Sequence, residues 1–157
     1  MQKLLKDCFT TFKTMGENIL MIDLNNPMNI RISNVPWAHK DNPPRTAQFE
    51  TFPTAYDGLH AGMENVLHCQ TMHGCKTISA IISRLSPPTE NNTTQYTAHV
   101  CDGCGVQADE DYDLTVVQNL VDISKGIVLE ENGKNPYTDE LLTEIATDLT
   151  KDISHDR

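Results

Sequence analysis

Residues 114–133, LTVVQNLVDISKGIVLEENG, decide the fold class of this 157-residue chain. Apolar residues recur every three or four positions as far as Leu129, which predicts a buried amphipathic helix. Two acids and Asn132 follow, and then Gly133, a residue that commonly ends a helix. The second acid, Glu131, is therefore expected where an apolar helix reaches the surface.

The same periodicity predicts further helices on both sides of this stretch. Apolar spacing over residues 3–20 predicts an N-terminal helix, assigned to residues 1–22. Residues 54–150 are predicted to form a helical body, with Thr54 as the first N-cap. Residues 151–157 are expected to fray. With no repeat or linker, residues 1–157 are predicted to form a single, mainly α domain.

Prolines interrupt the segment between the first two predicted helices, residues 23–53. Because proline removes a backbone donor and clashes inside a helix, this segment is expected to be an irregular loop. At most one short β-hairpin is predicted, around residues 30–33 and 47–51.

Composition excludes several classes of protein. The formal net charge is −10 and the pI is about 4.8, which argues against nucleic acid as a partner. No apolar run reaches the roughly 18 residues of a membrane span. The first residues lack the pattern of a secretory signal, so we expect synthesis in a cytoplasm.

Cysteine spacing leaves a zinc site open as an alternative. Cys101 and Cys104 have the two-residue gap of a zinc knuckle, and Cys69 and Cys75 could complete the set. The other interpretation is small buried side chains, with no metal and no cofactor.

Several short motifs occur together between residues 25 and 142. They are Asn26-Pro27-Met28-Asn29-Ile30-Arg31, Trp37, Phe49-Glu50-Thr51-Phe52, Gly58, Ala61, Thr77-Ile78, Ile81-Ile82-Ser83-Arg84, Pro87-Pro88, Glu90-Asn91, Thr93, Tyr96, Glu131-Asn132-Gly133 and Pro136-Tyr137. Taken together, this set resembles a family of small bacteriophage and prophage virion (structural) proteins. Their pattern is itself similar to a rearranged lysozyme-like or lytic transglycosylase domain. The resemblance implies a lysozyme-like fold, or a circular permutation of it, in a virion protein with other virion proteins as partners.

Glu131 is the candidate catalytic residue. Cleavage of a glycosidic bond requires a carboxylic acid to protonate the leaving oxygen, and a partly apolar site favours the protonated form. Glu130 is the competing candidate, since adjacent helical residues point about 100° apart. The alternative is a surface acid without a catalytic role.

Six other residues are candidates for binding peptidoglycan or another glycan. Amide and guanidinium groups form directional hydrogen bonds, and aromatic rings stack on sugars. Each has a structural alternative, such as a turn for Asn29 or a core position for Trp37. The candidates are Asn29, Arg31, Trp37, Glu90, Tyr96 and Tyr137.

Three departures from the family pattern bear on this cleft. The family usually has Gly at position 28, Trp at position 85 and Asp at position 92. Met28, Leu85 and Asn92 therefore remove an aromatic ring and a carboxylate from the expected site.

Three hypotheses follow. The first is a virion-associated peptidoglycan-cleaving enzyme that acts at the cell envelope, the second a non-catalytic virion protein on the same scaffold. The third is a zinc-stabilised interaction module.

Overall fold

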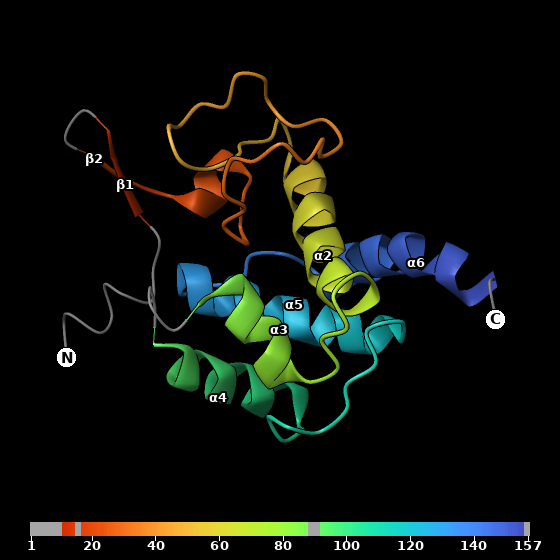
Figure 1. Cartoon of the computed structure of the whole chain (residues 1–157). Helices are drawn as coiled ribbons and strands as arrows, with labels where there is room; N and C mark the ends of the chain where they lie inside the picture. Colours follow the sequence, from red (N-terminus) through yellow and green to blue (C-terminus); the bar gives the residue numbers. More distant parts are fainter. Residues whose placement is uncertain (1–10, 15–16, 88–91, 156–157) are drawn as a thin grey trace.

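The computed structural model describes residues 11–14, 17–87 and 92–155, and within them the chain is mainly α-helical. Five α-helices follow a short hairpin and one 3-10 turn (Figure 1). The elements are β1 (Thr11–Thr14), β2 (Glu17–Leu20), η1 (Met21–Leu24), α2 (Ala55–Thr71), α3 (Ile78–Leu85), α4 (Thr93–Cys104), α5 (Val117–Asn132) and α6 (Asp139–His155). The expectation of a mainly α fold is confirmed, but the hairpin lies at β1 and β2 rather than around residues 30–33 and 47–51, where it was predicted.

The predicted N-terminal helix over residues 1–22 is wrong where the structure describes it. Strands β1 and β2 pair antiparallel, with Thr11 opposite Leu20 and Thr14 opposite Glu17. Threonine and asparagine are weak helix formers, and β-branched residues favour strands. In this segment, those local preferences prevailed over a helical apolar spacing. Residues 1–10 lie outside the described part of the chain.

The proline-rich segment is irregular, as expected, and pairs at one point. A single antiparallel bridge joins Arg31 to Phe49, between the two stretches predicted to form a hairpin. Ion pairs connect other parts of the proline-rich segment. Lys40 lies 2.9 Å from the buried carboxylate of Glu50. Figure 1 shows this segment arching over the N-terminal end of α2.

Capping residues mark the helix ends, and those predicted at Thr54 and Gly133 are present. The Thr54 side chain accepts a hydrogen bond from the backbone N–H of Asp57, and the Thr77 side chain accepts one from Ala80. Gly133 ends α5 at φ 74°, in the left-handed region that favours glycine. Helix α6 continues to His155, into the stretch that is predicted to fray.

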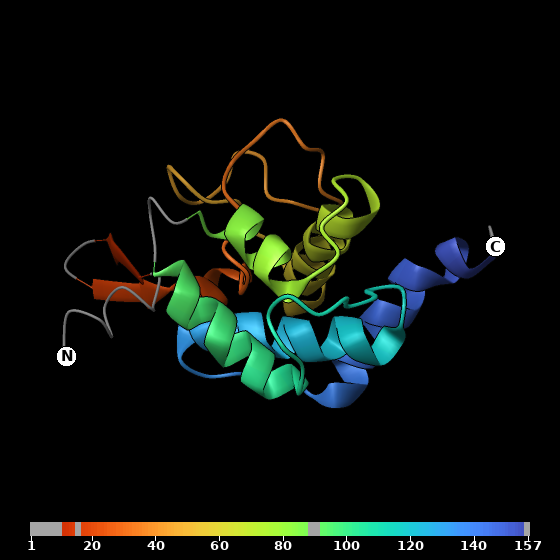
Figure 2. The ribbon, with the colours of Figure 1, turned by 60° about the horizontal axis from the view of Figure 1, so that its bottom comes forward.

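Helix α5 is the centre of the core. It packs against α4, α6 and α2 (Figure 2), and Leu120, Ile123 and Val128 are completely buried. A second, smaller cluster lies under the proline-rich segment and comprises Ile30, Trp37, Phe52 and Ala61. In the described part of the chain, no helix is long and apolar enough to cross a membrane.

Glycine allows the front loop to approach α2 closely. A Cβ atom at Gly58 would lie 1.5 Å from the carbonyl oxygen of Asn25. A Cβ atom at Gly62 would lie 2.6 Å from the Met28 sulfur. The residues 25–31, which we name the Asn-Pro loop, therefore lie directly on the α2 surface.

Candidate active site

A cleft of about 460 Å³ opens between the Asn-Pro loop and the helices. Its walls come from the loop and its extension to Trp37, from α2, and from α3, α4 and α5. The lining residues are Met28, Asn29, Ile30, Arg31, Ser33, Val35, Trp37, Gly62, Asn65, Val66, Cys69, Arg84, Leu85, Tyr96, Ile127 and Glu131.

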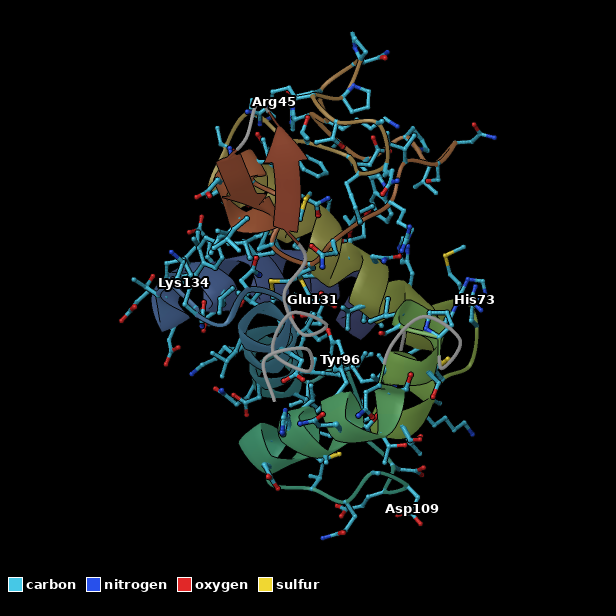
Figure 3. All side chains as sticks on the ribbon, turned by 90° about the vertical axis from the view of Figure 1, so that its left-hand side faces the viewer. Arg45, His73, Tyr96, Asp109, Glu131 and Lys134 are labelled. Carbon is cyan, nitrogen blue, oxygen red and sulfur yellow. The ribbon has the colours of Figure 1, made fainter. Side chains whose placement is uncertain are left out.

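Glu131 lies in this cleft with a hydrogen-bond donor on each carboxylate oxygen. The Asn29 side-chain amide donates to Oε2. The Tyr96 hydroxyl donates to Oε1 over 3.0 Å. Figure 3 shows Glu131 and Tyr96 near the middle of the molecule, between Arg45 and Asp109. Residues 102 positions apart in sequence thus meet at one carboxylate.

The Asn-Pro loop has a rigid base that places Asn29. The Asn26 side chain is fully buried and donates to the backbone oxygens of Ile30 and Glu50, at 2.9 and 2.8 Å. The backbone N–H of Ile30 donates back to Asn26 Oδ1. Asn29 itself adopts φ 58°, which asparagine tolerates better than most residues. Asn26 therefore closes the turn, and Asn29 points to Glu131.

Asn132 fixes the loop to the end of α5. Its side chain is almost fully buried and donates to the backbone oxygen of Pro27 over 2.8 Å and to that of Val128 over 3.0 Å. Two consecutive residues at the end of α5 therefore bind different parts of the Asn-Pro loop. Asn132 binds the loop backbone, and Glu131 binds the loop side chain.

Tyr96 remains a hydrogen-bond donor over the whole physiological pH range. Burial raises the pKa of its hydroxyl well above the ordinary value, and the nearby Glu131 carboxylate raises it further. A neutral hydroxyl is suited to hold a carboxylate in place, because it donates one hydrogen bond without adding charge.

Glu130, the competing candidate, faces another direction. Its carboxylate lies 2.9 Å from Nδ1 of His99 on α4, and Glu130 does not line the cleft. Two acids adjacent in sequence therefore have different partners on α4, as a 100° turn of the helix requires.

The remaining predicted residues divide into three groups. Arg31 and Trp37 line the cleft with Asn29 and Tyr96. Tyr137 does not line it but packs half-buried against the core, and burial raises its pKa to about 12. Glu90 lies outside the described residues.

All three departures from the family pattern lie in the described part of the chain. Met28 packs against Gly62 in the cleft wall, and Leu85 lines the same cleft. Asn92 caps α4 by accepting a hydrogen bond from the backbone N–H of Gln95. The cleft is also lined by residues that were not predicted as candidates, among them Asn65 and Arg84. Arg84 was part of the recognised motif set.

The structure offers the predicted cysteines no metal site. Cys69, Cys75, Cys101 and Cys104 are free thiols. Within residues 11–14, 17–87 and 92–155, no group of three or more His, Cys, Asp or Glu side chains is placed to hold a metal ion. Burial raises the pKa of the Cys69 thiol to about 11, so this cleft residue is a weak nucleophile.

Comparison with known proteins finds a bacteriophage relative. Protein P5 of Pseudoalteromonas phage PM2 is 31% identical over 122 residues, which cover 73% of this chain and 71% of Protein P5. The chain belongs to the Protein P5 family. No protein-family model matches the chain. The expected relationship to a bacteriophage protein family is thus confirmed.

Proposed function

We propose that this Protein P5 relative is a virion-associated enzyme that cleaves glycosidic bonds of peptidoglycan, with Glu131 as the general acid. The observation that carries the proposal is the Glu131 carboxylate, held in an open cleft by Asn29 and Tyr96. The relationship to a phage protein supports a place in the virion. The lysozyme-like resemblance of the motif set supports a glycan as substrate.

Glu131 would act in its protonated form. It transfers its proton to the bridging oxygen, the bond from that oxygen to C1 breaks, and the leaving sugar keeps the proton as a hydroxyl group. Asn29 suits both protonation states, because an amide can present either its NH₂ group to a carboxylate or its oxygen to a carboxylic acid. Tyr96 fixes the other oxygen throughout.

Glu131 is the one acid among the described residues that line the cleft. A single acid is sufficient where the acetamido oxygen of an N-acetyl sugar attacks C1 as the leaving group departs. A hydroxyl group, from water or from the sugar itself, then attacks C1 and returns a proton to Glu131. This sequence of steps restores the enzyme without a second carboxylate.

The proposed chemistry implies where the protein acts. The protein is made in the host cytoplasm, enters the particle with other virion proteins, and meets peptidoglycan at the cell envelope. The alternative is a structural virion protein on the same scaffold, in which the hydrogen bonds to Glu131 only join the Asn-Pro loop to α5.

Comparison of Glu131→Gln with Glu130→Gln separates these functions. Both variants lose one negative charge from the end of α5, but only Glu131 lies in the cleft. We expect Glu131→Gln to reduce the release of soluble fragments from purified peptidoglycan by about 10²–10⁴-fold. Glu130→Gln should keep most of the activity. An inactive wild-type protein, or equal losses in the two variants, would favour the structural alternative.

A further inference from the structure

We infer that Asn65 is a ligand-binding residue of the cleft, and that its side chain hydrogen-bonds an amide of the ligand, the acetamido group of an N-acetyl sugar. The sugar as ligand rests on the proposed function, whereas the preference for an amide rests on Asn65 itself. Asn65 lies in α2 and lines the same cleft as Glu131.

One face of α2 forms a wall of this cleft. Its residues are spaced three and four positions apart, which places them on the same side of the helix. They are Gly62, Asn65, Val66 and Cys69. Gly62 lies against Met28 of the Asn-Pro loop, and the helix rises by about 10 Å from there to Cys69. Asn65 is therefore about one helical turn from the contact with the loop.

The Asn65 amide forms no hydrogen bond within the part of the chain that the structure describes. The other asparagines with described side chains that are buried or partly buried each form at least one side-chain hydrogen bond. They are Asn25, Asn26, Asn29, Asn119, Asn132 and Asn135. Asn65 is also partly buried, but neither of its polar side-chain atoms is completely enclosed. Its donor and its acceptor are thus available to a ligand in the cleft.

Asparagine does not favour the helix at this position. Asn65 lies in the interior of α2. Asparagine is a weaker helix former than alanine, because its side chain competes for backbone groups. No side-chain hydrogen bond of Asn65 to the described residues offsets this cost. A residue that weakens its own helix without forming an internal hydrogen bond is typical of a functional position.

An amide of a ligand matches the Asn65 side chain. Nδ2 can donate to a carbonyl oxygen while Oδ1 accepts from an amide N–H, so two hydrogen bonds can form side by side. A hydroxyl group presents a single oxygen and pairs well with only one of these atoms. An acetamido group also carries a methyl group, and Val66, Leu85 and Ile127 provide apolar side chains in the same cleft. The cleft therefore offers partners for both parts of an acetamido group.

The acetamido group at Asn65 is distinct from the one that reacts. In the proposed reaction, an acetamido oxygen attacks C1. A hydrogen bond from Asn65 to that oxygen would make it a weaker nucleophile. Because each sugar of such a glycan carries an acetamido group, Asn65 binds the group of a neighbouring sugar.

Calorimetry in the Glu131→Gln background, which prevents cleavage, tests the inference with two neutral tetrasaccharides. Chitotetraose carries an acetamido group on every sugar, and cellotetraose carries a hydroxyl group in its place. We expect chitotetraose to bind more tightly. Adding Asn65→Ala should weaken binding of chitotetraose by about tenfold, through loss of two neutral hydrogen bonds, and leave binding of cellotetraose unchanged. Asn34→Ala is the matched control, because it removes an exposed amide that does not line the cleft.

Urea denaturation separates a binding role of Asn65 from a structural one. Because Asn65 forms no internal hydrogen bond and alanine favours the helix, Asn65→Ala should leave the urea midpoint unchanged or raise it. A lower midpoint, together with equal losses of affinity for the two tetrasaccharides, would mean that Asn65 supports the fold, and would overturn the inference.

Equal affinity for the two tetrasaccharides, or no binding of either, would also overturn it, as would equal effects of Asn65→Ala and Asn34→Ala. A free stem peptide of peptidoglycan is the third probe, because peptide bonds present the same amide chemistry. If Asn65→Ala weakens binding of this peptide and not of chitotetraose, the acetamido assignment is wrong. Failure of the proposed function is a separate outcome. A protein that prefers chitotetraose through Asn65 but does not cleave peptidoglycan would be a binding protein for N-acetyl glycans.

Discussion

Gly58→Ala tests whether close approach of the Asn-Pro loop to α2 holds the cleft together. The added Cβ would lie 1.5 Å from the Asn25 carbonyl oxygen and 2.6 Å from its carbonyl carbon. Carbon and oxygen atoms in contact are separated by roughly 3.3 Å, so the loop must retreat by about 1.8 Å. The clashing atoms are backbone, and rotation of a side chain does not relieve the overlap.

The loop is too strongly held to retreat without cost. Asn25 donates from its side chain to the backbone oxygen of Phe52 over 3.0 Å, and Asn26 is bonded on both sides. Overpacking costs about 1–3 kcal/mol, and each lost hydrogen bond adds about 1 kcal/mol. We expect Gly58→Ala to lower the free energy of unfolding by about 3 kcal/mol. Retreat of the loop would also separate Asn29 from Glu131.

Urea denaturation, followed by fluorescence of Trp37, measures this change. Trp37 is the single tryptophan and is 7% exposed, so its emission reports on unfolding. With a slope of roughly 2 kcal/mol per M urea, the midpoint should decrease by about 1.5 M. Gly103→Ala is the matched control, because Gly103 is exposed in the last turn of α4 and a Cβ there meets nothing within 4 Å. There alanine should leave the stability unchanged or raise it slightly, by at most about 0.5–1 kcal/mol. Midpoints that shift equally in the two variants would refute the reasoning.

Three further changes probe the surroundings of the cleft. Asn132→Ala removes both bonds of a buried amide, so the free energy of unfolding in urea should decrease by about 1–3 kcal/mol; no change would mean that this side chain does not hold the Asn-Pro loop. Tyr96→Phe removes one donor from Glu131, and we expect kcat on peptidoglycan to decrease by about tenfold with little change in KM; unchanged kcat would exclude a positioning role. The hydrogen bond with Lys151 lowers the pKa of Asp148 most, and the hydrogen bond with His60 of α2 lowers it next. The Asp148 carboxylate therefore stabilises the fold at pH values above its unfolded-state pKa, and this stabilisation is lost as the pH falls through its folded-state pKa. Asp148→Asn should therefore lower the urea midpoint only slightly at neutral pH, because the pair is exposed, and it should match the wild type in strong acid.

The sequence predicted the helical body well because its signals are local. Thr54 and Thr77 cap helices, and Gly133 ends one, through contacts within four residues. The N-terminal segment was assigned wrongly because its apolar spacing also fits a strand pair. Pairing of Phe12 with Ile19 depends on a partner strand, which a helical template does not consider.

Prediction of the cleft depended on different information. Glu131 and the Asn-Pro loop were selected separately, one from a helix end and one from a motif, and neither signal contains their contact. Arg84 carries no local signal for a place in the cleft, since an arginine near a helix C-terminus is ordinary. Tyr137 is aromatic and close in sequence to Glu131, but the chain turns away after Gly133. Only the packing of α5 against α4 and the loop determines which side chains meet.

The hydrogen bonds that join the Asn-Pro loop to α5 span 102 and 105 residues of sequence. A ribosome that adds 5–20 residues per second completes the loop roughly 5–20 s before it reaches the partner carboxylate. Closing such a long stretch also carries a large entropic cost, which the late contacts must repay. During synthesis, the Asn-Pro loop therefore lacks its hydrogen-bonding partners until the end of α5 has been made. A fragment that stops before Glu131 lacks the proposed general acid, so the proposed catalytic site forms only after α5 has been synthesised.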